Sequence, residues 1–372
     1  MSPILAYILR RLFLIIPTLF GIMVANFIIV QAAPGGPIEQ MIAKVRGTAL
    51  SSVSHIGGAS FTDAQISNSQ AIAGNDLSHK YAGARGLDPE FIAQLEKMYG
   101  FDKPAYQRFM IMIKNYLTFN FGDSYFKERS VLQLIADRLP VSVSLGLWTT
   151  LLIYFISIPL GIAKATRDGS AFDIWTSSII IVGYAVPSFL VAIFLIVLFA
   201  GGSFWQIFPL RGLVSDNWAQ LSWMQRVFDY IWHITLPVLA LVISGFASLT
   251  LLTKNSFLEE IHKQYVLTAR AKGLSERQVL YGHVFRNAML IVIAGLPGAI
   301  VHILLTSSLL IEVIFSLDGL GLLGFEAVTS RDYPVIFGTL YIYTLINLLV
   351  HVCGDLTYML VDRRIDFAKR IG

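Results

Sequence analysis

Few residues in this 372-residue chain are of types and spacings that could do chemistry. Cys353 is the only cysteine, which excludes an intrachain disulfide and a cysteine-based metal site. The sequence has neither the Gly-x-x-x-x-Gly-Lys-[Ser/Thr] pattern that cradles nucleotide phosphates nor the His-Glu-x-x-His pattern of zinc peptidases. Ser307 and Ser308 follow His302 in an apolar segment, where packing between helices explains them better than an activated nucleophile does. We therefore expect a chain that is not an enzyme and binds no metal.

Six further polar residues stand inside apolar segments, where such residues are functional candidates by default. They are Asn26, Gln31, Glu312, Asn347, His351 and Asp355. The last three are four residues apart, so a helix would place them on one face, which would line a pathway or meet a partner subunit. Ordinary polar contacts between helices are the alternative. Glu312 and Asp355 stand near segment ends, which weakens a proton-relay role.

The elements that would position these residues are membrane spans. The chain is 55% hydrophobic and only 14% charged, with a mean hydropathy of +0.65, which excludes a soluble enzyme and a mainly disordered chain. A bilayer core takes about 20 apolar residues in a helix. Six segments meet that length, and we predict an all-α polytopic membrane protein from them: 12–33, 141–163, 174–200, 234–252, 288–311 and 335–361.

The first apolar segment could also be a signal peptide, since Arg10 and Arg11 precede it and Val30-Gln31-Ala32 faintly resembles a cleavage site. Its apolar core exceeds signal-peptide length, so we favour a retained helix. Lys and Arg in the short connecting segments number 14 on one side and 3 on the other. The basic side faces the cytoplasm. Both termini are therefore expected to be cytoplasmic, in the inner membrane of a bacterium.

The predicted organisation has four parts. Residues 1–33 form the cytoplasmic tip and first span, 34–139 an exterior insertion, 140–362 a five-helix core, and 363–372 a cytoplasmic tail. Within the insertion, the Gly/Ser-rich stretch 47–86 predicts a flexible loop and 87–139 a small helical cap, with helices after Asp88 and over 106–117.

The longest segment inside the cytoplasm, 254–287, is the most informative one. Ala, Arg and Lys favour a helix that Gly273 ends, and Ser275 is placed to cap a second helix. Two short helices joined by a glycine form an angular corner. Small Ala269 and Ala271 would let another protein approach closely, and Arg270 and Lys272 would pair with acidic groups there. An ordinary basic loop is the alternative.

The stretch Thr268-Ala-Arg-Ala-Lys-Gly-Leu-Ser275, followed by His283 and Arg286-Asn-Ala288, resembles the coupling motif of ABC importer permeases of the oligopeptide/dipeptide branch. Leu267-Thr268-Ala269 replaces the Glu-Ala-Ala of the older motif, so no glutamate-based docking contact is assigned. The resemblance implies that the following residues contact an ATPase subunit: Tyr265, Thr268, Ala269, Arg270, Ala271, Lys272, Gly273, Leu274 and Ser275.

Other stretches resemble the same family over nearly the whole chain. They are Arg10-Arg11, Ala33–Pro37, Tyr99–Pro104, Phe121–Ser124, Arg138–Pro140, Gly319–Gly321 and Arg331–Pro334. With its extra stretch at 47–86, the chain looks most similar to the Yej-type branch, which is associated with oligopeptides and microcin C.

The resemblance implies a type I importer permease fold with six transmembrane helices, which forms half of a peptide pathway. It also implies several partners: a second, homologous permease as a heterodimer, two P-loop ATPase subunits or one fused pair that bind ATP and Mg, a periplasmic solute-binding protein, and membrane lipid. Nucleic acid is not among them. An ion-gradient-driven secondary transporter that acts without an ATPase is the main alternative, but no internal repeat supports it. A membrane enzyme is the third, less supported reading.

Overall fold

A computed structural model describes residues 3–32, 90, 103–201, 204–305 and 309–361, and within these residues it is helical with no strand. The longer helices are α1 Pro3–Ala32, α5 Ala105–Leu117, α6 Val131–Thr166, α7 Ala171–Ala185, α8 Ser188–Phe199, α9 Trp223–Ile261, α12 Phe285–Leu305 and α15 Tyr333–Val361. The shorter ones are η2 Trp218–Gln220, α10 Gln264–Ala271, α11 Glu276–Val279, the π-helix η3 Leu280–Val284, α13 Leu309–Ile314 and α14 Leu320–Ser330. The loop predicted at 47–86 and nearly all of the helix predicted after Asp88 lie outside the described residues.

Five described helices are long and apolar enough to cross a membrane, and a bent pair makes a sixth candidate. The segment predicted as a span over 174–200 forms two apolar helices, α7 and α8, which meet at a bend of 94°. Pro187 causes the break: it has no N–H to continue the helix, and it holds the preceding Val186 extended, at φ −90° and ψ 120°. Of the span predicted at 288–311, α12 covers the residues up to Leu305 and α13 begins at Leu309, while residues 306–308 lie outside the described residues.

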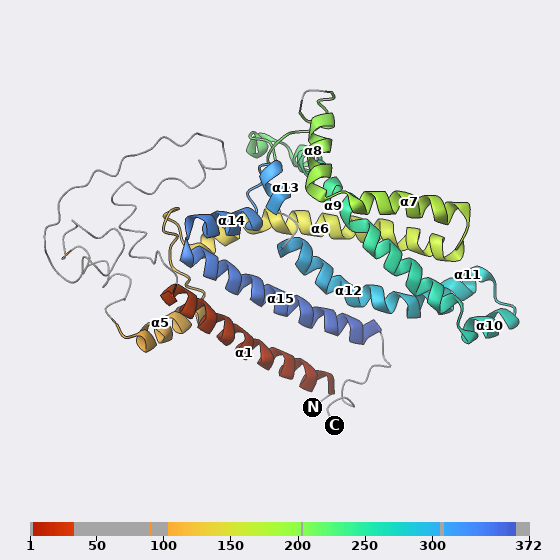
Figure 1. Cartoon of the computed structure of the whole chain (residues 1–372), viewed down its shortest axis with the longest axis horizontal. Helices are drawn as coiled ribbons and strands as arrows, with labels where there is room; N and C mark the ends of the chain where they lie inside the picture. The colour runs from red at the N-terminus through yellow and green to blue at the C-terminus, as the bar shows by residue number, and fades with distance from the viewer. Residues whose placement is uncertain (1–2, 33–89, 91–102, 202–203, 306–308, 362–372) are drawn as a thin grey trace. The chain divides into compact units, whose positions relative to one another are not determined.

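The chain divides into two compact units. The first contains residues 1–14, 138–323 and 345–372, and the second contains residues 15–137 and 324–344. In the first unit α9 is central and packs against α7, α8 and α12 (Figure 1). Small residues allow close contact of α6 with α9: a Cβ on Gly161 would lie 2.6 Å from that of Thr253. Helix packing inside a membrane depends on such small residues.

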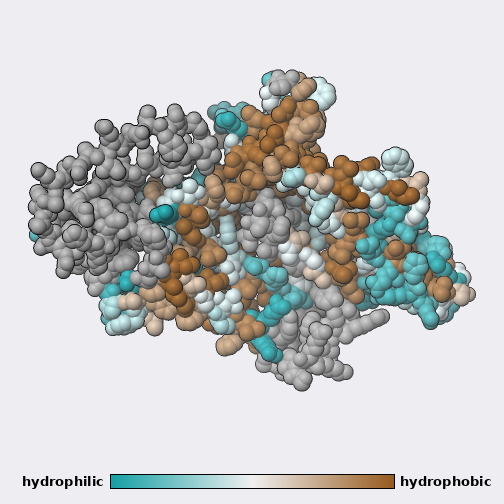
Figure 2. Space-filling view, in the orientation of Figure 1, coloured by the Kyte–Doolittle hydropathy of each residue, from teal (hydrophilic) through white to brown (hydrophobic). Residues whose placement is uncertain are grey.

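The surface of the first unit has two characters. Hydrophobic side chains gather over α7 and α8, whereas hydrophilic ones gather over α10 and α11 (Figure 2). On α7, Ile174, Trp175, Ile179 and Val182 are each at least 60% exposed. A surface this apolar is typical of helices that face lipid or another subunit. The hydrophilic surface over α10 and α11 is typical of a region outside the membrane, in water.

In the second unit, two motifs that are far apart in the sequence are in contact: Phe121–Ser124 and Arg331–Pro334. Ser124 donates a hydrogen bond to the buried carboxylate of Asp332, which also accepts one from the backbone N–H of Tyr125 at 3.3 Å. Nearby, Lys127 pairs with Glu326 at 2.6 Å. Burial raises the pKa of the Asp332 carboxyl, although the Ser124 hydrogen bond opposes that rise. These contacts hold the segment after α5 against the start of α15.

Aromatic rings fill the remainder of this unit. Tyr116, at the end of α5, meets Phe121 and Tyr341 edge to face, with ring centroids 5.0 and 5.3 Å apart. A Cβ on Gly338 would lie 2.6 Å from Val131, so only glycine fits between these elements. The helix predicted over 106–117 is confirmed as α5. Helix α6 starts at Val131 and continues through Pro140, so it contains the span predicted at 141–163 and extends beyond it on both sides.

Candidate functional site

The coupling segment at 254–287, predicted as two short helices joined by a glycine, is a helical corner in the first unit. Its first residues belong to the end of α9 and its last ones to the start of α12, with α10, α11 and η3 between them. The path leaves α9 at His262, whose Nδ1 lies 2.7 Å from the carbonyl oxygen of Leu258. Because most of the segment is hydrogen-bonded helix, the corner has a defined shape.

The junction of α9 and α10 is held by Glu260. It forms an ion pair with Lys263 and accepts a hydrogen bond from the Tyr265 hydroxyl at 2.7 Å. The Glu260 hydrogen bond raises the pKa of the Lys263 ammonium, and burial raises the pKa of the Tyr265 phenol. Both groups therefore keep their neutral-pH charge states. Tyr265 is half-buried, so part of its ring packs against other residues of this chain and is not open to a partner subunit.

The turn at Gly273 is confirmed as the point where the first short helix ends. Gly273 has φ +83°, a left-handed conformation that favours glycine. Its N–H bonds to the Arg270 carbonyl at 2.9 Å, and the Leu274 N–H bonds to the Ala269 carbonyl at 3.4 Å. This pair of bonds is the Schellman termination of a helix.

The second short helix starts as predicted, at Ser275. The Ser275 hydroxyl accepts a hydrogen bond from the Gln278 N–H, and the Gln278 side chain accepts one from the Ser275 N–H at 2.9 Å. This reciprocal arrangement is a capping box. The π-turn η3 follows directly and leads into α12 without a break. π-turns have no simple sequence signature, and the prediction missed this one.

The exposed part of the corner is smaller than the predicted set. Thr268, Arg270, Ala271, Lys272, Gly273 and Ser275 are exposed, whereas Leu274 is half-buried. The interpretation of Ala269 as a surface that another protein approaches needs correction, because this residue is only 5% exposed. It packs in a cluster that includes Ile162, Phe257 and Val266. The small side chain of Ala269 lets α10 pack closely against neighbouring helices of the same chain.

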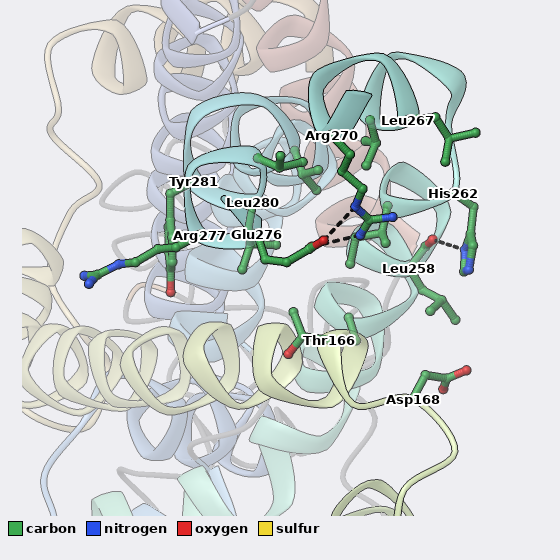
Figure 3. A pocket seen from close by; sticks show the side chains of 15 residues that line it. Thr166, Asp168, Leu258, His262, Leu267, Arg270, Glu276, Arg277, Leu280 and Tyr281 are labelled. Carbon is green, nitrogen blue, oxygen red and sulfur yellow. Dashed lines mark hydrogen bonds and ion pairs between the residues drawn. The ribbon is translucent and has the colours of Figure 1, made fainter. Parts of the chain in front are cut away.

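Arg270 also has a partner inside the chain. Its guanidinium makes two contacts with the Glu276 carboxylate, each 2.9 Å long, and so links α10 to α11 across the glycine (Figure 3). A bidentate pair of this kind fixes direction as well as distance. The predicted role of Arg270 in pairing with another protein therefore competes with this contact, and Lys272 is the exposed cation beside it.

A cleft of about 970 Å³ lies behind the corner (Figure 3). Its walls come from the end of α6, the end of α9, α10, α11 and η3. Leu258, Val266 and Leu280 give it apolar walls, while Arg270 and Glu276 give it a charged rim. Beside the cleft the corner still packs on the bundle, since Val266 and Ala269 belong to one buried cluster with Ile162 of α6 and Phe257 of α9.

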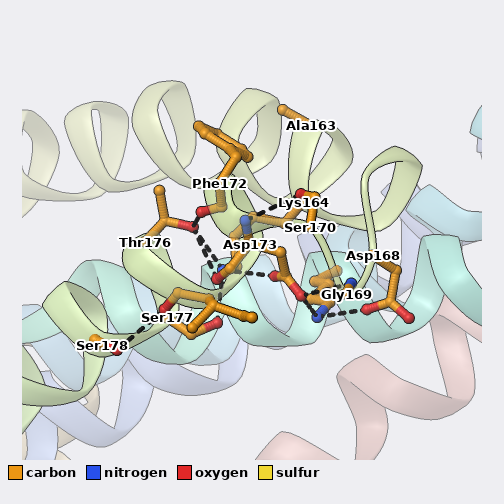
Figure 4. A network of polar contacts seen from close by, with 12 residues as sticks. Ala163, Lys164, Asp168, Gly169, Ser170, Phe172, Asp173, Thr176, Ser177 and Ser178 are labelled. Atoms are coloured by element: carbon orange, nitrogen blue, oxygen red, sulfur yellow. Dashed lines mark hydrogen bonds and ion pairs between the residues drawn. The ribbon is translucent and has the colours of Figure 1, made fainter.

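A buried network of charges lies at the same end of the unit (Figure 4). Lys164 of α6 is fully buried, and its ammonium lies 2.9 Å from the Asp173 carboxylate at the start of α7. It also donates to Thr176 and Ser177, both at 2.8 Å. Lys254 of α9 reaches the other oxygen of Asp173 at 2.7 Å. One carboxylate thus joins three helices, a set we call the polar clamp: Lys164, Asp173 and Lys254.

The sequence did not reveal the polar clamp. Both lysines counted only as basic residues of the inside segments. Asp168, outside the clamp, also pairs with Lys254 at 2.8 Å but remains half-exposed. The available signal in the sequence is a lysine followed nine residues later by an aspartate, across the Gly169 turn. This spacing alone does not predict a buried ion pair, and it identifies no partner helix.

The six polar candidates of the spans are divided between the two units. Asn26 is buried in the second unit, and the side chain of Gln31 lies outside the described residues. Asn347 is half-buried and His351 is exposed, while Asp355 pairs with Arg11 at 2.7 Å. Among described residues, no group of three His, Cys, Asp or Glu side chains is arranged to hold a metal ion.

Glu312 has a local role. It is fully buried in α13 and accepts hydrogen bonds from the Ser142 hydroxyl at 3.3 Å and from the Leu322 N–H at 2.7 Å. A Cβ on Gly319 would lie 2.3 Å from this carboxylate. The carboxylate therefore ties α13 to the start of α14 and to α6, and the glycine of the Gly319-Leu-Gly321 motif makes room for it.

Comparisons with known proteins agree with this architecture. Residues 157–367 match the family model described as binding-protein-dependent transport system inner membrane component. The chain is 60% identical to the peptidoglycan transport system permease protein YejB of Agrobacterium fabrum over 98% of this chain and 99% of that one. It is 59% identical to the inner membrane ABC transporter permease protein YejB of Escherichia coli O157:H7, over 98% and 100%.

A more distant relative also aligns over nearly its whole length. The oligopeptide transport system permease protein AppB of Bacillus subtilis is 31% identical over 97% of this chain and 99% of that one. The family match covers more than half of the chain, and the relatives align from end to end. The chain therefore belongs to the binding-protein-dependent inner-membrane permeases of ABC transporters, and it has their all-helical type I importer fold.

Proposed function

We propose that this chain is one permease subunit of an ATP-driven importer that takes up oligopeptides from the periplasm. More specifically, we propose that its substrates include peptide-nucleotide antibiotics of the microcin C type. The names of the oligopeptide and dipeptide permeases among the relatives, together with the motif resemblance, support peptides as cargo. The chain would form half of the pathway and a second, homologous permease the other half. Both termini would face the cytoplasm.

The observation that carries the proposal is the exposed glycine corner between α10 and α11. ATP and Mg would bind to partner subunits, either two P-loop ATPases or one fused pair, and this chain would bind neither. The partner would contact Thr268 and the exposed residues from Arg270 to Gly273. A solute-binding protein would deliver the peptide from outside.

The packing of α10 supports a mechanical role. Val266 and Ala269 are buried against Ile162 of α6 and Phe257 of α9. Closely packed interiors transmit displacement because their side chains have no free space. A push on the corner would therefore move α10 together with α6 and α9. The polar clamp would make α7 follow, since Asp173 binds lysines from both helices.

A pull-down of the tagged chain from detergent-solubilised native membrane tests the proposal. We expect mass spectrometry to find a second polytopic permease and one or two P-loop ATPases, absent from a control with an unrelated tagged membrane protein. Peptide uptake by vesicles should then need all of these chains. Uptake by the purified chain alone would instead support the secondary transporter.

A further inference from the structure

A second hollow lies within the helix bundle of the first unit, apart from the glycine corner. It has a volume of about 440 Å³ and is lined by α6, α9 and α12, with one residue from the start of α8. None of its lining residues is charged. Hydroxyl groups supply most of its polar character, from Thr149, Thr150, Tyr154, Ser188, Ser244 and Ser248.

Two of these hydroxyls lack the partner that threonine ordinarily finds in a helix. Thr235, Thr250 and Thr253 of α9 each donate to the carbonyl four residues earlier, at 2.6 to 2.8 Å. Thr149 and Thr150 are 1% and 6% exposed, and their hydroxyls make no hydrogen bond in the part of the chain that the structure describes. A buried hydroxyl without a partner is costly, so a group that arrives in the hollow gains by bonding to it.

Small residues form part of the walls, and the space beside Gly295 is open, since nothing lies within 4 Å of a Cβ built there. Gly245, Gly295 and Ala299 lie among the lining residues. A Cβ on Gly245 would lie 2.6 Å from Cδ1 of Ile153, so glycine lets α6 and α9 meet at the hollow. Ser188 stands where the chain resumes as α8 after the bend at Pro187. Irregular backbone at membrane depth is tolerated where it is buried or lines a cavity.

We propose that this hollow, which we call the hydroxyl cleft, holds the main chain of a peptide during its passage through the membrane. This inference rests on the proposed function. Each peptide unit has an N–H donor and a C=O acceptor, and a hydroxyl can serve either one by rotating. The main chain is the same in all peptides, so hydroxyl contacts would accept cargo of varied sequence. An acyl chain of a lipid would leave Thr149 and Thr150 unpaired.

Photo-cross-linking in the complete importer tests the cleft. The complex would be reconstituted in lipid vesicles with its binding protein, and given the tetrapeptide Ala-Ala-photoleucine-Ala during ATP hydrolysis. We expect adducts at residues 149–154 and 244–249. The double change Thr149→Val and Thr150→Val should lower the adduct yield about tenfold, as the loss of two neutral hydrogen bonds predicts. Serine at both positions should restore the yield.

Thr250→Val is the matched control, because Thr250 is buried on α9, donates to Phe246 and does not line the cleft. Three results would overturn the inference. They are peptide adducts only elsewhere in the complex, labelling of the cleft by a photoreactive phosphatidylcholine but not by the peptide, and cross-linking of a probe at Ser248 to the second permease. Failure of the wild-type complex to take up any peptide would instead count against the proposed function.

Discussion

At the scale of single residues, the notable feature is a fully buried lysine. Lys164 keeps its charge away from water because Asp173 and two hydroxyls of α7 surround its ammonium. Burying a charge is costly unless it is paired and hydrogen-bonded. Asp173 therefore has a larger structural role than a surface aspartate, since it also holds Lys254.

The first prediction concerns that carboxylate. Asp173→Asn should destabilise the chain by about 3–5 kcal/mol, because it leaves the buried Lys164 without a counter-ion. Asp168→Asn, which removes a half-exposed partner of Lys254, should cost less than about 1 kcal/mol. Thermal unfolding of the two purified variants in detergent measures the difference. Equal stability of the two would contradict the polar clamp.

The second prediction concerns pH and Asp332. Its pKa is raised by burial in the folded chain, so the folded state holds the proton more tightly than the unfolded state. The stabilisation is complete below the ordinary aspartate pKa of about 3.9 and is lost as the pH rises through the raised pKa. Asp332→Asn should remove this decline, whereas Asn at the exposed Asp123 should not. Unfolding temperatures across the acidic range test this, and an unchanged slope in Asp332→Asn would refute it.

At the scale of elements, local signals were read well and distant ones were not. Gly273 and Ser275 predicted their turn because helix ends depend on neighbouring residues. Pro187 and Gly183 permit a kink within 174–200, but the sequence does not predict the 94° angle between α7 and α8, because neither hydropathy nor a proline fixes the direction of a bend. Ala269 was misread as a contact surface, since its burial depends on Phe257 and Ile162, which other helices supply. The polar clamp was missed for the same reason.

The third prediction belongs to the glycine corner. Gly273→Val should uncouple ATP hydrolysis from peptide uptake, because a β-branched residue is strained at φ +83° while the space around it is open. Gly273→Asn should keep most of the coupling, since asparagine tolerates this conformation. The ratio of peptide taken up to ATP hydrolysed, in vesicles with equal amounts of inserted complex, is the measurement. Normal uptake by Gly273→Val would remove the basis for the coupling role.

At the scale of the whole molecule, composition alone predicted an all-helical membrane protein, and the family match confirms the permease fold. The hydrophilic corner lies at one end of α9, and the exposed Trp223 begins the same helix at its other end. A single helix thus runs from the corner past the hydroxyl cleft. The sequence could not predict how ATP binding would move the corner, or how the corner would move the helices around the cargo. Both depend on packing between helices and on other chains.

The most direct test of the coupling role is site-specific photo-cross-linking in the intact complex. A benzoylphenylalanine placed at Lys272 should form an adduct with an ATPase subunit, because this side chain is exposed on the corner. The same probe at Trp223, which is 74% exposed at the far end of α9, should form none. An ATPase adduct from position 272 alone is the predicted result. A complex that retains its ATPase but gives no adduct from 272, or gives equal adducts from both positions, would contradict the account.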